Sequence, residues 1–205
     1  MIDVINLKKS FGETEVLKDI SVTINKGDIV VVLGPSGSGK STLLNSILHL
    51  LPQDFNIQGE IYWQDKNLYD LKAKQLTHIY GKEIAFISQN PQTFFCPVRT
   101  IKSQFIETIS AHQKITADEI ISQALDIFTK IGLNDGKNIL SAYPFMLSGG
   151  MNQRINIALT MMLKPQLLIA DEPTGNLDPE TAKEIMGLLE DINKAGTTIL
   201  MATHA

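Results

Sequence analysis

The sequence predicts an α/β fold built around a mainly parallel sheet, and three features support this. Short apolar runs rich in β-branched residues alternate with stretches whose apolar residues recur at helical spacing. The uncharged run 29–33 leads through a glycine-rich turn into one of these helical stretches. The run 166–170 is almost continuously apolar, which is typical of a strand buried in a parallel sheet. Strands that alternate with helices indicate an α/β core.

The first third of the chain is predicted to be rich in strands. Its apolar runs are short, and Gly12 and Gly27 separate them. After the glycine-rich turn, apolar residues in the stretch 41–51 recur at helical spacing and stop before Pro52, which predicts a helix over those residues. The strands predicted here span residues 2–7, 16–24, 29–33, 57–63 and 83–88.

The pattern becomes mostly helical from residue 90 to about residue 163. Thr116 and Glu119 form a capping box, in which each side chain can accept a hydrogen bond from the backbone N–H of the other residue. Farther on, Asp178 and Pro179 are typical of a helix start, and Gly196 is typical of a helix end. The predicted helices span residues 100–112, 116–131, 148–163 and 178–195, and the last strands span residues 166–170 and 197–202.

Composition limits the classes of function. With 205 residues the chain is long enough for one domain with a real core. The net charge of -4 gives no overall indication of nucleic-acid binding, and a single cysteine, Cys96, excludes a disulfide within the chain. The N-terminus lacks the layout of a signal peptide, and every apolar run is too short to cross a bilayer. Any link to a membrane is therefore expected to run through a partner protein.

A glycine-rich loop suited to phosphate lies between the predicted strand 29–33 and the helix that follows it. The loop fits G-x-x-x-x-G-K-[ST], in which glycines let several backbone N–H groups face one polyphosphate. The helix adds its positive N-terminal end. Lys40 can reach the β- and γ-phosphates, and the Ser41 hydroxyl can bind Mg²⁺. The residues predicted to hold ATP here are Gly34, Pro35, Ser36, Gly37, Ser38, Gly39, Lys40, Ser41 and Thr42.

Two carboxylates end the apolar run near residue 170. In an open parallel sheet, ligands collect at the carboxyl edge of the strands, and the phosphate loop follows another such edge. Asp171 is therefore predicted to hold Mg²⁺, and Glu172 to orient or deprotonate the attacking water. An Asp-Glu pair in this position often only caps a helix, but the phosphate loop upstream favours the catalytic interpretation.

A third motif, Leu147-Ser-Gly-Gly-Met-Asn-Gln-Arg154, distinguishes among phosphate-loop ATPases. Ser148, Gly149 and Gly150 begin a helix with small residues, which is a second anion-binding surface. The motif resembles the LSGGQ signature of ATP-binding-cassette (ABC) ATPases and lies shortly before the acidic strand, as in that family. The resemblance implies that the signature of one subunit closes over the ATP of another, so that the chain pairs with a second copy or a sister ATPase.

Further positions match the same family. Gln89 resembles the Q-loop glutamine, which contacts Mg²⁺ or water and senses the transmembrane partner. His204 resembles the switch histidine that contacts the γ-phosphate, and Gly175-Asn-Leu-Asp178 resembles the D-loop that connects the two ATP sites. Phe11 falls where the family places an aromatic ring that stacks on adenine, with core packing as the alternative. Together the motifs imply catalytic roles for Glu172, His204 and Gln89, and Mg²⁺ ligands at Ser41, Gln89 and Asp171.

The resemblance runs through the whole chain and implies a fold. It implies a P-loop NTPase core formed by residues 1–89 and 164–205, with an N-terminal antiparallel β subdomain and an inserted helical subdomain over residues 90–163. Family members usually continue beyond the histidine with further strands and a helix, and commonly have an acidic residue where this chain has Ala205. These departures predict either a fragment or impaired hydrolysis.

The resemblance implies a cytoplasmic ATP-hydrolysing subunit, peripheral on the inner face of the cell membrane, that powers solute transport through transmembrane permease subunits. The N-terminal part is similar to polar amino-acid importers, and the middle to peptide and nickel importers. The C-terminal part is similar to lipoprotein-release, macrolide-export and cell-division ATPases. The middle motifs favour import. The alternatives are a non-transport ABC ATPase and a regulatory cassette that binds ATP with little turnover.

Overall fold

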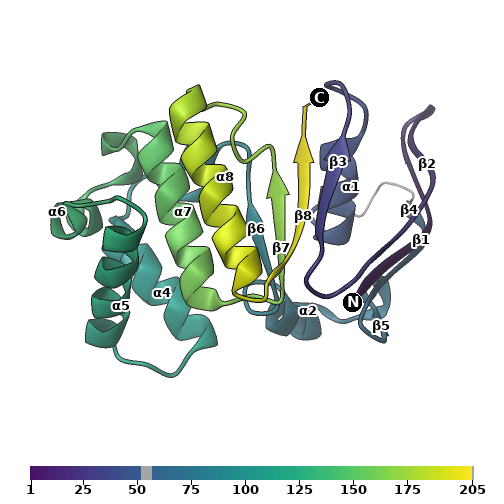
Figure 1. Cartoon of the computed structure of the whole chain (residues 1–205). Coiled ribbons are helices and arrows are strands. Elements are labelled where there is room, and N and C mark those ends of the chain that lie inside the picture. Colours follow the sequence, from purple (N-terminus) through teal and green to yellow (C-terminus); the bar gives the residue numbers. More distant parts are fainter. Residues whose placement is uncertain (52–56, 205) are drawn as a thin grey trace.

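Two sheets make up the strand content of the computed structural model, which describes residues 1–51 and 57–204 (Figure 1). The parallel sheet has the order β3 (Ile29–Leu33), β8 (Thr198–Thr203), β7 (Leu167–Asp171) and β6 (Ile84–Ile87). The antiparallel sheet has the order β2 (Thr14–Ile24), β1 (Ile2–Phe11), β4 (Ile57–Trp63) and β5 (Lys66–Asn67). The predicted fold, a parallel core sheet with an N-terminal antiparallel β subdomain, is confirmed.

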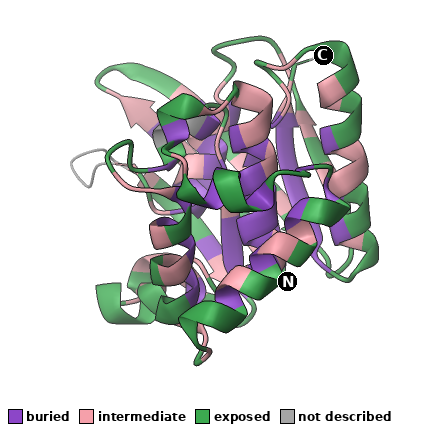
Figure 2. Cartoon of the chain, turned by 90° about the vertical axis from the view of Figure 1, so that its left-hand side faces the viewer, coloured by how far each residue is buried: buried purple, intermediate pink, exposed green. Residues whose placement is uncertain are grey.

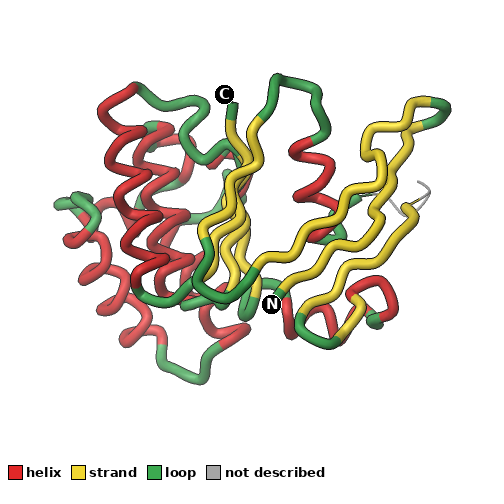
Figure 3. The backbone as a smooth tube through the Cα atoms, turned by 45° about the vertical axis from the view of Figure 1, so that its right-hand side comes forward, coloured by secondary structure: helices red, strands yellow, loops and turns green. Residues whose placement is uncertain are grey.

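Helices lie on both faces of the parallel sheet, but Ile29, Val31 and Leu33 of the edge strand β3 remain exposed. Helix α1 (Lys40–Ile47) lies between the two sheets, and α7 (Gly149–Leu163) and α8 (Pro179–Lys194) lie on the opposite face (Figures 1 and 3). The side chains of β7 alternate between the two sides, because Ile169 packs in the cluster with α1 whereas Leu168 packs in the cluster with α8. All five residues of β7 are buried, as the apolar run predicted (Figure 2).

A separate hydrophobic cluster lies among the helices between residues 95 and 162. Helices α4 (Ile101–His112), α5 (Ala117–Lys130) and α6 (Gly136–Ser141) pack there with α7. The predicted capping box at the start of α5 is present, since the Thr116 hydroxyl accepts from the Glu119 N–H and the Glu119 carboxylate accepts from the Thr116 N–H. Within the described residues, no helix combines the length and the apolar character that a bilayer span requires.

The structure corrects one predicted helix and adds elements that the sequence did not indicate. The helix expected over residues 41–51 ends at Ile47, because the chain turns there and His49 adopts a left-handed backbone with φ 57°. Pro52, expected to mark the helix end, and Ala205 lie outside the described residues. The additional elements are β5, α2 (Ala73–Ile79), α3 (Pro91–Phe94), α6 and two 3-10 turns at Leu68–Asp70 and Pro144–Met146.

Candidate nucleotide-binding site

The phosphate loop connects β3 to α1 at the carboxyl edge of the parallel sheet, as predicted. One of its glycines, Gly39, is required by the local geometry. Gly39 has φ 92°, and a Cβ atom there would lie 3.0 Å from Val16 Cγ1 and 3.3 Å from the Val16 carbonyl oxygen. The neighbouring strand β2 therefore presses directly on the start of α1, and only glycine fits at the contact.

Lys40 is held inside the loop. Its ammonium donates hydrogen bonds to the carbonyl oxygens of Gly34, at 2.7 Å, and Pro35, at 3.0 Å. The same Nζ atom lies 4.0 Å from Glu172 Oε1, and both side chains are almost fully buried. The loop thus positions one positive charge at the end of β3, in contact with the acidic end of β7.

Asp171 and Ser41 form a pair at the end of β7. The carboxyl of Asp171 is only 7% exposed, and burial raises its pKa, while a hydrogen bond from the Ser41 hydroxyl acts in the opposite direction. Its Oδ1 atom has no hydrogen-bond partner among the described residues. A buried, unpaired carboxylate oxygen beside a hydroxyl suits a hard cation such as Mg²⁺, which keeps most of its shell from water and phosphate.

Glu172 brings the three predicted catalytic side chains together. It is 8% exposed, and its Oε2 accepts a hydrogen bond of 2.8 Å from Gln89 Nε2. Its Oε1 lies 2.8 Å from His204 Nε2. Gln89 follows β6, Glu172 follows β7 and His204 follows β8, so the three meet because parallel strands end at one edge.

A cavity of about 320 Å³ lies over these groups. Gln89, Glu172 and His204 line it together with the phosphate loop, and Val16 of β2 forms an apolar part of its wall. Val16 could not be predicted as a site residue, because in the sequence it resembles any other apolar strand residue. Of the residues predicted to bind ATP, Ser36, Gly37, Gly39, Lys40, Ser41 and Thr42 line the cavity, whereas Gly34, Pro35, Ser38, Phe11, Ser148, Gly149 and Gly150 do not.

The predicted signature surface is separate from that cavity. Ser148 is the N-cap of α7 and accepts a hydrogen bond from the Met151 N–H, and Gly149 and Gly150 form the first turn. Within one chain, the structure does not bring these residues onto the phosphate loop. Each chain therefore presents two predicted anion-binding surfaces that do not share a cavity.

Phe11, the predicted adenine contact, lies at the end of β1 and is partly buried. The Lys9 ammonium lies 5.1 Å from the centroid of its ring. Phe11 is outside the hydrophobic clusters of the described residues, where core packing would have placed it. Stacking on adenine stays a prediction.

The family model described as ABC transporter matches residues 17–175, and the chain belongs to this family. The chain is 37% identical over 190 residues to a metal-staphylopine import system ATP-binding protein of Staphylococcus aureus, covering 93% of this chain and 70% of that protein. It is 37% identical over 211 residues to a probable D,D-dipeptide transport ATP-binding protein of Escherichia coli, covering 100% of this chain and 64% of that protein.

A solved structure supports the fold over the full length. The chain matches an ATP-binding cassette solved as a dimer in a post-hydrolysis state bound to ADP and Pi, with a TM-score of 0.86 and 32% identity. The match covers 100% of this chain and 88% of that cassette. The chain therefore spans most of the solved cassette. It spans less than two thirds of the D,D-dipeptide transport protein.

Proposed function

We propose that this chain is the ATP-binding and ATP-hydrolysing subunit of a solute importer and works with transmembrane permease subunits. The observation that carries the proposal is the convergence of Gln89, His204 and Lys40 on the buried carboxylate of Glu172. A phosphate loop, a carboxylate and two polar side chains at one strand edge are the parts that ATP hydrolysis needs.

The residues divide the chemistry among them. The loop N–H groups and Lys40 bind the β- and γ-phosphates, and Glu172 accepts a proton from the attacking water. Gln89 and His204 orient the water and contact the γ-phosphate. Ser41, Asp171 and Gln89 are the proposed ligands of Mg²⁺, which when bound neutralises charge on the phosphates.

Dimer formation completes the proposed site. A solved cassette that forms a dimer is similar to the whole length of this chain. In the proposed dimer, Ser148, Gly149 and Gly150 of one subunit meet the γ-phosphate bound by the other. The second subunit is a copy of this chain or a sister ATPase. Closure with ATP and opening after hydrolysis then give the two states that a permease can use.

The proposed contact with the permease lies beside Gln89. We assign residues 90–163 to a helical subdomain inserted into a nucleotide-binding core of residues 1–89 and 164–205. A cavity of about 370 Å³ runs between the two parts, and Leu50 and Phe94 are exposed at it. An exposed apolar surface of this kind suits a protein partner, which would hold the chain at the inner face of the membrane.

The class of solute is proposed from the relatives. Their names specify metal-staphylopine import and D,D-dipeptide transport. We therefore propose uptake of a solute of the peptide, metal or amino-acid type.

The test is coupled turnover. Phosphate release is measured for wild type and Lys40→Ala, over a titration of Mg²⁺, alone and in vesicles with the permease subunits that co-purify with the chain. We expect Mg²⁺-dependent release that Lys40→Ala abolishes and that solute stimulates in the vesicles. Release equal in both variants would reject the ATP site. Release without any response to permease or solute would reject the transport role.

A further inference from the structure

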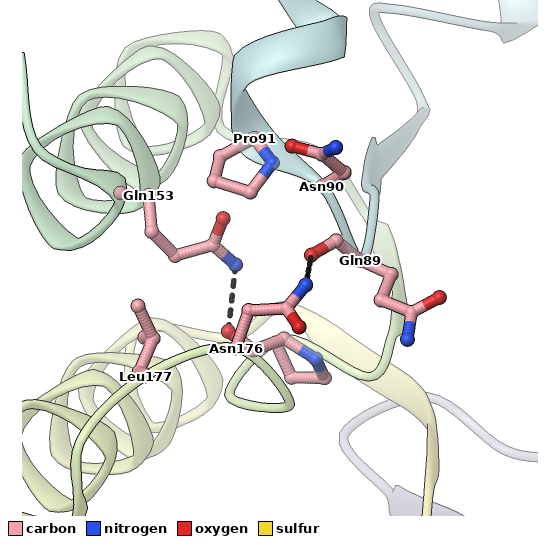
Figure 4. Close-up of a pocket in the computed structure, with 8 residues that line it drawn as sticks. Gln89, Asn90, Pro91, Gln153, Asn176 and Leu177 are labelled. Carbon is pink, nitrogen blue, oxygen red and sulfur yellow. Dashed lines mark hydrogen bonds between the residues drawn. The ribbon is translucent and has the colours of Figure 1, made fainter.

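A buried glutamine links the signature helix to the catalytic carboxylate. Gln153 of α7 is 1% exposed, and its Nε2 donates a buried hydrogen bond of 2.8 Å to the carbonyl oxygen of Pro173. Pro173 directly follows Glu172 in the chain. Figure 4 shows the Gln153 amide extending from its helix toward this carbonyl.

The segment that Gln153 contacts has an unfavourable backbone conformation. Glu172 has φ 46°, in the left-handed region that residues other than glycine rarely adopt. The chain turns there, and the Gly175 N–H donates to the Glu172 carbonyl oxygen at 3.0 Å. We name residues 172–175 the acidic turn. A hydrogen bond to the middle of this turn constrains the direction in which the Glu172 carboxylate points.

The same helix begins at the signature. Ser148 caps α7, and Gln153 lies five positions farther on, or roughly 7 Å along the axis at about 1.5 Å per residue. A helix is stiff over this length, so a displacement of its first turn is transmitted to Gln153. One end of this rigid unit is therefore an anion-binding surface, and the other contacts the acidic turn.

Within the described residues, the side-chain amide of Gln153 is hydrogen-bonded through its nitrogen alone. Its Oε1 is buried and has no hydrogen-bond partner among the described residues, so a single bond fixes the amide. Gln153 also lines a cavity of about 300 Å³ together with Gln89 and Asn176. Across this cavity, Asn176 Nδ2 donates to the Gln89 carbonyl oxygen at 3.3 Å (Figure 4). The segments that contain Gln89, Gln153 and Asn176 thus meet around a cavity.

We infer that Gln153 is a positioning residue for hydrolysis: it connects the signature of a chain to Glu172 of the same chain, and so links the two ATP sites of a dimer. The inference rests on the proposed function, in which Ser148 contacts the ATP of the partner. When that ATP draws the first turn of α7 into place, Gln153 places the acidic turn. The carboxylate that serves the chain's own ATP is then aligned.

The test compares two identical substitutions. Gln153→Met preserves side-chain volume and removes the hydrogen bond to Pro173. Gln113→Met is the matched control, because Gln113 Nε2 donates a hydrogen bond of 2.9 Å to the Met162 carbonyl oxygen at the far end of the same helix. Steady-state hydrolysis gives kcat, KM and the Hill coefficient for ATP, and light scattering with ATP gives dimer formation.

For Gln153→Met we expect kcat to fall about 100-fold, the scale of a catalytic group displaced by roughly 1 Å. KM and ATP-dependent dimer formation should stay within about threefold of wild type, and the Hill coefficient should fall toward one. Gln113→Met should leave all four close to wild type. Gln153→Asn retains the amide on a shorter side chain and should recover part of kcat.

Several outcomes would overturn the inference. A kcat for Gln153→Met within threefold of wild type, or an unchanged Hill coefficient, would show that the bond does not position Glu172. Equal losses in both methionine variants, or in Gln153→Met and Gln153→Asn, would assign Gln153 to folding alone. Wild-type chain without Lys40-dependent hydrolysis would instead reject the proposed function, so the two failures are distinguishable.

Discussion

Replacing Glu172 by glutamine separates ATP binding from hydrolysis. The substitution preserves the shape of the side chain and removes its charge and its ability to accept a proton. Glu172 is buried, contacts Gln89 and His204 at 2.8 Å each, and lies 4.0 Å from the Lys40 ammonium. Loss of a general base lowers turnover by about 10²- to 10⁴-fold. We expect kcat of Glu172→Gln to fall within that range.

The same substitution should strengthen the ATP-bound dimer. At an effective dielectric constant of about 20, two unit charges at this separation interact by about 4 kcal/mol. In the wild type, the Glu172 carboxylate and the γ-phosphate compete for Lys40, and they repel each other. If Glu172→Gln makes one third of the Lys40–Glu172 interaction energy available to ATP binding, the gain is about 1.4 kcal/mol, or tenfold in ATP affinity. With hydrolysis removed as well, the closed dimer should persist.

Light scattering with and without Mg-ATP is the assay. Glu172→Gln should double in mass when ATP is added, and a second substitution, either Lys40→Ala or Ser148→Arg, should abolish the change. Lys40→Ala removes the phosphate contact within the chain, whereas Ser148→Arg blocks the signature across the interface. A Glu172→Gln chain that binds ATP and remains a monomer would refute the sandwich arrangement, and wild-type turnover would refute the role of Glu172 as base.

Further perturbations test other parts of the structure. Gly39→Ala should weaken ATP binding at least tenfold by calorimetry, because its Cβ would press against β2 in a left-handed backbone. Thr116→Ala should lower unfolding stability by about 1 kcal/mol in urea, whereas Thr129→Ala, inside the same helix, should not. The hydrogen bonds from Thr116 lower the pKa of Glu119, so their contribution to unfolding stability is present above about pH 4.3 and is lost as the pH falls. The difference in unfolding stability between Thr116→Ala and wild type should therefore narrow in acid. Phe128→Ala, in the core of the helices, should cost about 3 to 5 kcal/mol.

The sequence was sufficient where a local pattern determines the structure. Residues 29–42 contain a strand, a glycine-rich turn and a helix start, each with its own signal, and all three form as predicted. Short elements could not be predicted, because they contain too few residues to form such a local pattern. Helix α3 has four residues, which is too few to show a helical period, and β5 has two.

Contacts between distant segments could be predicted only in outline. Strand order explains why Gln89, Glu172 and His204 share an edge, but no pattern showed that both partners would meet the same carboxylate. Val16 reaches the cavity because β2 lies against the phosphate loop at Gly39, a contact between segments that no local pattern predicts. Gln153 stood in the quoted signature motif, yet its bond to Pro173 depends on how α7 packs against the acidic turn.

The placement of these groups bears on why hydrolysis should require a pair of chains. Side chains of the same chain contact both oxygens of the Glu172 carboxylate, and the Glu172 N–H donates to the Ala202 carbonyl oxygen. The acidic turn is also held by Gln153 of α7, and α7 begins at the signature. A nucleotide bound by the partner is the one ligand in the proposed dimer that acts on that end. Coupling through α7 would therefore make each subunit hydrolyse ATP only when its neighbour also holds ATP.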